Sequence, residues 1–93
     1  MAIRLAVNMS AAKGKGDEFA KAFSANLPKV QKEPGCEEYA LFRNVEDPDS
    51  FILMERWRSQ ADLDIHGALL RSTTSTTAHL RGPNPAKVER YEV

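Results

Sequence analysis

Residues 34–57 read PGCEEYALFRNVEDPDSFILMERW, and this stretch decides the fold. Residues 36–45 and 50–57 are rich in aromatic and β-branched side chains, which favour strands. Between them lies Glu46-Asp47-Pro48-Asp49, a sequence typical of a tight turn. The stretch therefore predicts an antiparallel hairpin.

The chain before the hairpin predicts one strand and one helix. Residues 2–9 have the period of two that is typical of a strand. Their apolar side chains share one face: Ile3, Leu5, Val7 and Met9. From Asp17 to Val30 apolar residues recur every three or four positions, which predicts an amphipathic helix. Pro28 should kink this helix, and Pro34-Gly35 should end it.

A second helix is expected after the hairpin. Ser59 and Asp62 have the spacing of a capping box, with Asp in place of the usual Glu. The predicted apolar side of this helix comprises Ala61, Ile65, Ala68 and Leu69. Gly67 could break the helix early, and the Ser/Thr cluster at 72–77 fits a frayed end or a loop.

A last strand is predicted at residues 87–92, after Gly82-Pro83-Asn84-Pro85. Val88 and Tyr91 fall on opposite faces under strict alternation, so a bulge or burial on both sides is expected. The predicted order is β-α-β-β-α-β, an α+β ferredoxin-like arrangement with an antiparallel sheet in one domain spanning residues 1–93.

Both faces of this sheet need a cover. Residues 40–42 and 51–54 are consecutively apolar, whereas helices normally cover one sheet face only. Closed two-fold dimers use one surface twice and are the commonest oligomers. We therefore expect a homodimer.

Composition excludes several partners and classes. Lys plus Arg and Asp plus Glu each number 13, so no net charge attracts nucleic acid or an anionic membrane. Cys36 is the single cysteine, which rules out an internal disulfide and suits a reducing compartment. No secretory signal pattern or stretch of about 20 apolar residues is present. A soluble cytoplasmic protein is expected.

Four sequence features together resemble the antibiotic biosynthesis monooxygenase family. They are the Pro34-Gly35-Cys36-Glu37-Glu38-Tyr39 strand, the Asp47-Pro48 turn, the Phe51…Glu55-Arg56-Trp57 strand, and a helix with Leu63 and with His66 nine residues beyond the Trp. The likeness spans about residues 3 to 92. It implies a dimeric α/β barrel, in a family that includes cofactor-independent monooxygenases acting on phenols and quinols.

Other members bind haem or process autoinducer-type molecules, so the resemblance leaves the function open. The haem-degrading branch is expected to carry an Asn on the first strand and a Trp and a His along the second helix. Asn8 matches, but the Trp position falls on His66, and the His position falls near Thr76, with His79 three residues later. Haem breakdown is therefore disfavoured, and no cofactor is expected.

His66 is the main candidate for catalysis. An imidazole can accept and donate a proton near neutral pH, and Asp62 lies one helical turn earlier, where it could orient the ring. The alternative is a structural or surface histidine. Asn8 is the second catalytic candidate, because its amide could hydrogen-bond a substrate carbonyl or oxyanion. Its alternative is a strand-end Asn that serves a turn.

Further residues are candidates for lining a substrate pocket. Tyr39 and Arg43 share one face of the second strand, and Glu55 and Trp57 share one face of the third. Trp57 could equally be core, and Glu55 could form a buried ion pair with Arg43 or another arginine. His79 is a weaker substrate-binding candidate. No ligand spacing supports a metal site.

These residues suggest three functions. The first is a cofactor-independent monooxygenase that uses molecular oxygen on a small phenol or quinol, with His66 moving the proton. The second is an isomerase or degrading enzyme for a small hydroxyketone. The third is a dimeric ligand-binding module without catalysis.

Overall fold

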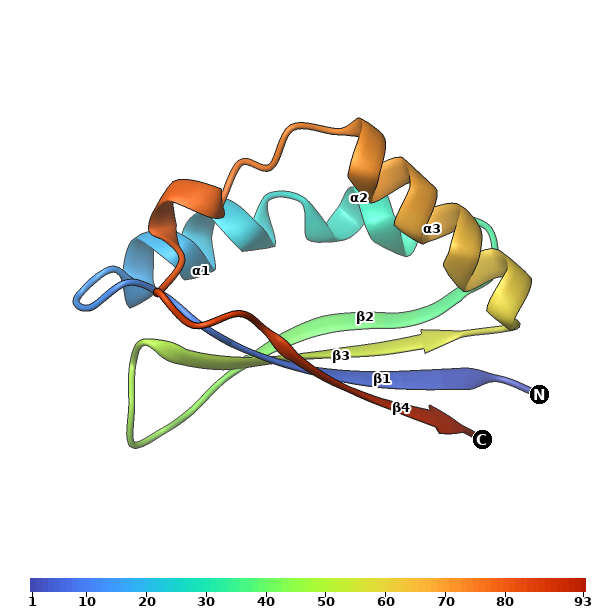
Figure 1. Cartoon of the computed structure of the whole chain (residues 1–93), viewed down its shortest axis with the longest axis horizontal. Coiled ribbons are helices and arrows are strands. Elements are labelled where there is room, and N and C mark those ends of the chain that lie inside the picture. The colour runs from blue at the N-terminus through green and yellow to red at the C-terminus, as the bar shows by residue number, and fades with distance from the viewer.

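The predicted hairpin forms half of a four-stranded antiparallel sheet in the computed structural model, which describes residues 1–93. The strand order is β2-β3-β1-β4. The strands are β1 (Ile3–Ser10), β2 (Cys36–Arg43), β3 (Ser50–Trp57) and β4 (Lys87–Glu92). All helices lie on one face of this sheet (Figure 1). The ferredoxin-like β-α-β-β-α-β prediction is confirmed.

The segment predicted as one kinked helix contains two separate helices, α1 (Gly16–Ser24) and α2 (Leu27–Gln31). Pro28 lies in the first turn of α2. A helix does not need a backbone N–H there, and the fixed proline φ suits a helix start. The expected kink is therefore wrong, because Pro28 helps begin a new helix instead of bending an old one.

The β2–β3 turn is fastened to the start of α1. Both carboxylate oxygens of Asp49 accept backbone hydrogen bonds, from Gly14 N (2.9 Å) and from Gly16 N (2.9 Å). A Cβ on Gly16 would lie 2.0 Å from the Pro48 carbonyl oxygen, so only glycine fits this approach. Strand β2 ends two residues earlier than predicted, because the Asn44 side chain accepts from Glu46 N and begins the turn.

Helix α3 (Gln60–Ser72) begins as predicted, with the Asp62 N–H donating to the Ser59 hydroxyl (3.2 Å). It continues through Gly67, so the early break is wrong. The predicted apolar side is also wrong. Its residues Ala61, Ile65, Ala68 and Leu69 are all exposed, whereas Asp62 and His66 are buried. The helix thus turns polar side chains toward the sheet, and these form a site.

Strand β4 is an exposed edge strand. It pairs with β1 in an uninterrupted register, so the bulge expected there is wrong; the irregularity of the sheet lies in β2 between Cys36 and Glu38. Val88 and Tyr91 lie on opposite faces, and both are exposed. A short 3-10 helix, η1 (Ala78–Leu80), connects the segment after α3 to this strand.

The helix-covered face of the sheet contains the core. Phe19 and Trp57 are its fully buried large side chains. On β3, burial alternates, with Phe51, Leu53, Glu55 and Trp57 buried and the residues between them half-buried. The intervening side chains and Phe42 of β2 lie on the open face. None of the helices combines the length and the hydrophobicity that a membrane-spanning segment requires.

Candidate functional site

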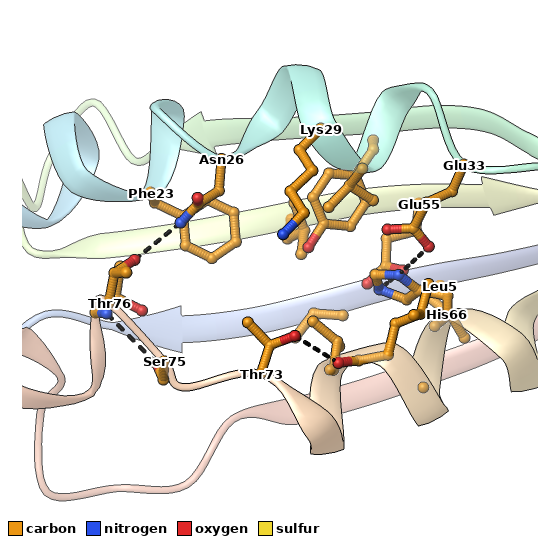
Figure 2. A pocket seen from close by; sticks show the side chains of 18 of the residues that line it. Leu5, Phe23, Asn26, Lys29, Glu33, Glu55, His66, Thr73, Ser75 and Thr76 are labelled. Atoms are coloured by element: carbon orange, nitrogen blue, oxygen red, sulfur yellow. Dashed lines mark hydrogen bonds and ion pairs between the residues drawn. The ribbon is translucent and has the colours of Figure 1, made fainter.

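A cavity of about 860 Å³ lies between the sheet and the helices (Figure 2). Its floor is formed by β1, β2 and β3, with Leu5, Tyr39 and Glu55 among the lining residues. One wall comes from α1, α2 and the link that follows α2, and the other from α3 and residues 73–77. This volume is in the range of small-molecule sites.

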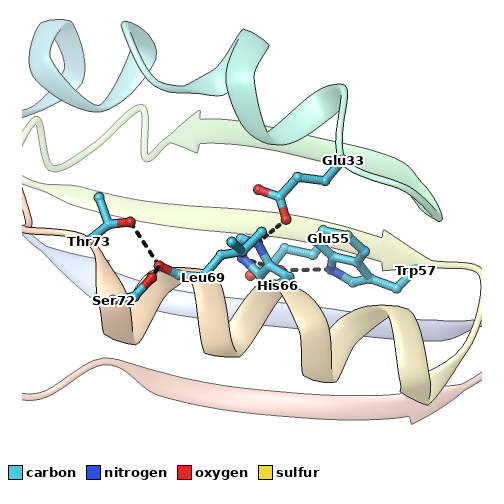
Figure 3. Close-up of polar contacts among 7 residues, drawn as sticks. All are labelled: Glu33, Glu55, Trp57, His66, Leu69, Ser72 and Thr73. Atoms are coloured by element: carbon cyan, nitrogen blue, oxygen red, sulfur yellow. Dashed lines mark hydrogen bonds and ion pairs between the residues drawn. The ribbon is translucent and has the colours of Figure 1, made fainter.

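His66 is almost fully buried, with 2% of its surface exposed, and its two ring nitrogens have different surroundings (Figure 3). Nδ1 lies 2.9 Å from Glu33 Oε1. Nε2 is buried and has no hydrogen-bond partner. An ionised carboxylate can only accept, so Glu33 holds the proton on Nδ1 and leaves the lone pair on Nε2. The result is an oriented base.

Glu55 and Trp57 support the imidazole from the sheet. The Trp57 ring stacks on that of His66, with centroids 4.6 Å apart, and its Nε1–H donates to Glu55 Oε1 (2.9 Å). The same oxygen lies 4.0 Å from His66 Nε2. Burial raises the pKa of Glu55, while the Trp57 hydrogen bond opposes this shift. Glu55 thus retains a proton more readily than an exposed glutamate.

Tyr39 completes the buried end of the cavity. Its ring meets that of His66 edge-on, with centroids 5.6 Å apart. Burial, and then the charges of Glu55 and Glu33, raise the pKa of the Tyr39 phenol above its usual value. The phenol therefore stays protonated and can donate a hydrogen bond to a bound molecule.

The arrangement can move a proton at the buried end of the cavity. Catalytic dyads and triads use the same arrangement. In them a carboxylate that is hydrogen-bonded to one ring nitrogen fixes the tautomer and the orientation of the base. Buried Nε2 with no partner is rare in folded proteins and calls for an explanation. A substrate O–H or C–H directed at Nε2 would supply the missing partner.

The structure brings together four of the predicted site residues: His66, Tyr39, Glu55 and Trp57. The expected role of Asp62 is wrong, because its carboxylate is engaged by Arg58 (2.9 Å) and Ser59 (3.0 Å), and these hydrogen bonds lower its pKa. The neighbour that holds the imidazole is Glu33.

The other three predicted residues lie elsewhere. Asn8 is exposed on the open face of the sheet, opposite to the cavity. Arg43 pairs with Asp17 (2.9 Å) and donates to the Pro48 carbonyl, so it forms no ion pair with Glu55. His79 is exposed on η1 and does not line the cavity.

Sequence reasoning missed Glu33, Lys29 and Arg81. All three line the cavity. Glu33 stands directly before Pro34-Gly35, which marks a chain reversal, but nothing local connects it to a histidine 33 residues later. The structure contains no group of three or more His, Cys, Asp and Glu side chains that could hold a metal ion.

Fold and cavity together define a ferredoxin-like domain with a cavity of small-molecule size and a buried histidine–carboxylate pair. The family model for antibiotic biosynthesis monooxygenases matches residues 2–83. The chain therefore belongs to this family.

Two solved structures and two curated proteins illustrate the relationship. A candidate antibiotic biosynthesis monooxygenase from Nitrosomonas europaea has a TM-score of 0.82 at 23% identity, covering 97% of this chain and 88% of its own. PA3566 from Pseudomonas aeruginosa has a TM-score of 0.81 at 24% identity, covering 97% and 91%.

Among curated proteins, the uncharacterized sll1783 of Synechocystis is 31% identical over 69% of this chain, and the candidate monooxygenase YcnE of Bacillus subtilis is 26% identical over 73%. The matched regions span only 44% and 63% of the lengths of these two relatives.

Proposed function

We propose that this protein is a cofactor-independent monooxygenase that deprotonates a small phenol or quinol in the cavity. The observation that carries the proposal is the unpartnered, buried His66 Nε2, oriented by Glu33 through Nδ1. Stacking on Trp57 stabilises the imidazolium that forms when the base accepts a proton. Family membership supports the oxygen chemistry.

The reaction uses electrons of the substrate alone. His66 Nε2 accepts the phenolic proton, and the electron-rich phenolate reacts with molecular oxygen at a ring C–H. One oxygen atom becomes the new carbonyl of a quinone, and the other leaves as water with the two hydrogens lost from O–H and C–H. The substrate supplies all four electrons. Tyr39 could donate to the developing carbonyl oxygen.

The experiment is oxygen uptake with a panel of hydroquinones and polycyclic phenols. His66→Ala should lower turnover by about 10²–10⁴-fold, the usual contribution of a general base. Ile65→Ala is the matched control, because Ile65 is exposed on the same helix and does not line the cavity. Activity that survives His66→Ala would remove the proposed role. A ligand that binds and is recovered unchanged would indicate a non-catalytic binding module.

A second candidate is isomerisation of a small hydroxyketone, favoured by one observation. Glu55 has a raised pKa and lies 4.0 Å from His66 Nε2, so a proton acceptor and a proton source stand side by side. The base would take a proton from the carbon next to the carbonyl and return it to the neighbouring carbon. This reaction consumes no oxygen, so anaerobic turnover with solvent deuterium uptake separates it from the first.

We also propose that two copies pack through the open face of the sheet. Phe42 is 50% exposed there, and Ile52 and Met54 lie beside it on β3. An apolar sheet face of this kind is covered most simply by an identical one. Sedimentation should give the mass of a dimer, and a stable monomer at high concentration would contradict this assembly.

A further inference from the structure

The charges that line the cavity are distributed unevenly. Three basic side chains, Lys29, Lys32 and Arg81, line it together with two acidic ones, Glu33 and Glu55. Glu33 is bound to His66, and Glu55 accepts from Trp57, so both carboxylates are used at the buried end. The basic side chains form no salt bridge with either of them.

Salt bridges involve six of the ten Lys and Arg side chains outside the cavity and none of the three that line it. Six Lys and Arg side chains are paired with carboxylates, and none of them lines the cavity: Arg4, Lys15, Arg43, Arg56, Arg58 and Arg90. The three cationic residues that do line the cavity have no carboxylate within 4.0 Å. The cavity therefore holds positive charge that the protein itself leaves without a counter-ion.

Lys29 and Arg81 belong to different segments of the chain around the cavity. Lys29 stands on α2 beside the buried Val30, and its side chain reaches into the cavity (Figure 2). Arg81 directly follows η1, where the chain is fixed to the end of β1. There Gly82 N donates to the Ser10 carbonyl (2.9 Å), and Ala12 N donates to the Leu80 carbonyl (2.7 Å). Arg81 lies close enough to Tyr39 for its charge to oppose the rise in the Tyr39 pKa caused mainly by burial.

Neutral donors surround the same part of the cavity. The hydroxyl-bearing segment 73–77 lines it, and Asn26 Nδ2–H donates to Thr76 Oγ1 (2.8 Å), which joins this segment to the α1–α2 wall. Ammonium, guanidinium and hydroxyl groups together are the donor set that carboxylate and phosphate oxygens require. A neutral phenol would not engage the charge of these donors.

We propose that the substrate carries an oxyanion, a carboxylate or a phosphate ester, which Lys29 and Arg81 bind while its acidic O–H or C–H faces His66. This inference rests on the proposed function for the reacting end of the molecule and adds the class of substrate. It distinguishes a carboxylated or phosphorylated small molecule from an uncharged quinol of the same size.

Equilibrium binding tests the proposal without any turnover. Trp57 is the only tryptophan of the chain and stacks on His66, so its fluorescence can report ligand entry. The carboxylate arm compares 2,5-dihydroxybenzoate with hydroquinone under nitrogen, and the phosphate arm compares dihydroxyacetone phosphate with dihydroxyacetone. In at least one arm the anion should bind about tenfold more tightly, as expected for one charge-assisted contact. The arm that responds identifies the group.

Lys29→Gln combined with Arg81→Gln should abolish this preference. Lys21→Gln is the control, because Lys21 is an exposed, unpaired lysine on α1 outside the cavity, and it should keep the preference intact. Added salt should weaken binding of the anion but not of its neutral counterpart. This salt test on the unaltered protein does not depend on the variants folding.

The proposal would be overturned if each anion bound only as tightly as its neutral counterpart in both comparisons. It would also be overturned if the preference for the anion survived the double substitution. The proposed function fails separately. Turnover that needs His66 but shows no preference for anions would refute only the oxyanion site. Selective anion binding without any turnover would refute only the enzyme.

Discussion

The helix-covered face of the sheet and its open face are built from alternate residues of the same strands, yet they have opposite surroundings. On β3, Trp57 is fully buried against His66, whereas the neighbouring Arg56 points to the other side and pairs with Glu37 (3.0 Å). On β2, Tyr39 is buried in the cavity floor and Phe42 is half-exposed. One face thus carries a cavity with a buried polar end within one chain, and the other carries apolar side chains, among them the half-exposed Phe42, that a second chain could cover.

The largest effect should come from removing a buried side chain on the helix-covered face of the sheet. Trp57→Ala removes a fully buried indole and leaves Glu55 without its donor, so the free energy of unfolding should fall by about 3–5 kcal/mol. Urea unfolding measures the change. Val45→Ala, at a fully exposed turn residue, should alter stability by no more than about 0.5 kcal/mol. Similar losses in both variants would mean that Trp57 is not part of the core.

Charging the open face should affect assembly rather than folding. Phe42→Asp places a carboxylate in the proposed dimer interface, which should weaken the dimer by about 2 kcal/mol or more, roughly 30-fold in dissociation constant. Sedimentation over a range of protein concentrations measures this. Val45→Asp adds the same charge off the face and should leave the dimer intact. If Phe42→Asp remains as dimeric as the control, the interface lies elsewhere.

Ionisation of Glu55 on the helix-covered face should make the stability of the protein depend on pH. Burial raises the pKa of Glu55 above its ordinary value of 4.5. A raised pKa means that the folded state favours the protonated form, so this contribution is present below pH 4.5 and is lost as the pH rises through the higher folded value. Glu55→Gln keeps the acceptor for Trp57 but cannot ionise.

Relative to the Gln variant, the unaltered protein should therefore lose stability as the pH is raised above 4.5. Urea unfolding of both proteins across this range provides the measurement. His66, Glu33 and Tyr39, the other titratable groups beside Glu55, are present in both proteins. Two stability curves that run parallel from acid to neutral pH would show that Glu55 ionises normally.

The smallest effect is expected at Asn8. Because Asn8 is exposed on the open face, Asn8→Ala should change stability by no more than about 0.5 kcal/mol. It should also leave the affinity of the cavity for its ligand unchanged, in the same fluorescence titration. A clear loss of ligand binding in Asn8→Ala would show that the site includes residues of the open face, and the division between the two faces would be wrong.

Local patterns were sufficient to predict the strands, because alternation depends on neighbouring residues only. The hairpin, the Ser59 cap and the order of elements followed from such patterns. The apolar side of α3 was predicted wrongly because the pattern assumes that apolar residues face the core. Here His66 and Asp62 face inward, and their partners come from the α2–β2 link, from β3 and from Arg58.

The site was predicted in part for a related reason. The alternation of side chains along a strand places Tyr39 and Arg43 on one face. Four residues of strand correspond to about 13 Å, however, so Arg43 lies at the opposite end of the sheet. The pairing of Glu33 with His66 joins residues far apart in the chain. It depends on how α3 packs over the α2–β2 link, and no spacing in the sequence encodes that packing.

The Asp49 carboxylate that holds the backbone of Gly14 and Gly16 has a consequence for protein engineering. Tips of hairpins are ordinarily the sites where inserted peptides, affinity tags or new chain ends are best tolerated. In this chain the tip is anchored to the beginning of the first helix, so an insertion at residues 46–49 would release that helix as well. Peptide grafts should instead enter the exposed stretch at residues 83–85, where the chain makes fewer such attachments.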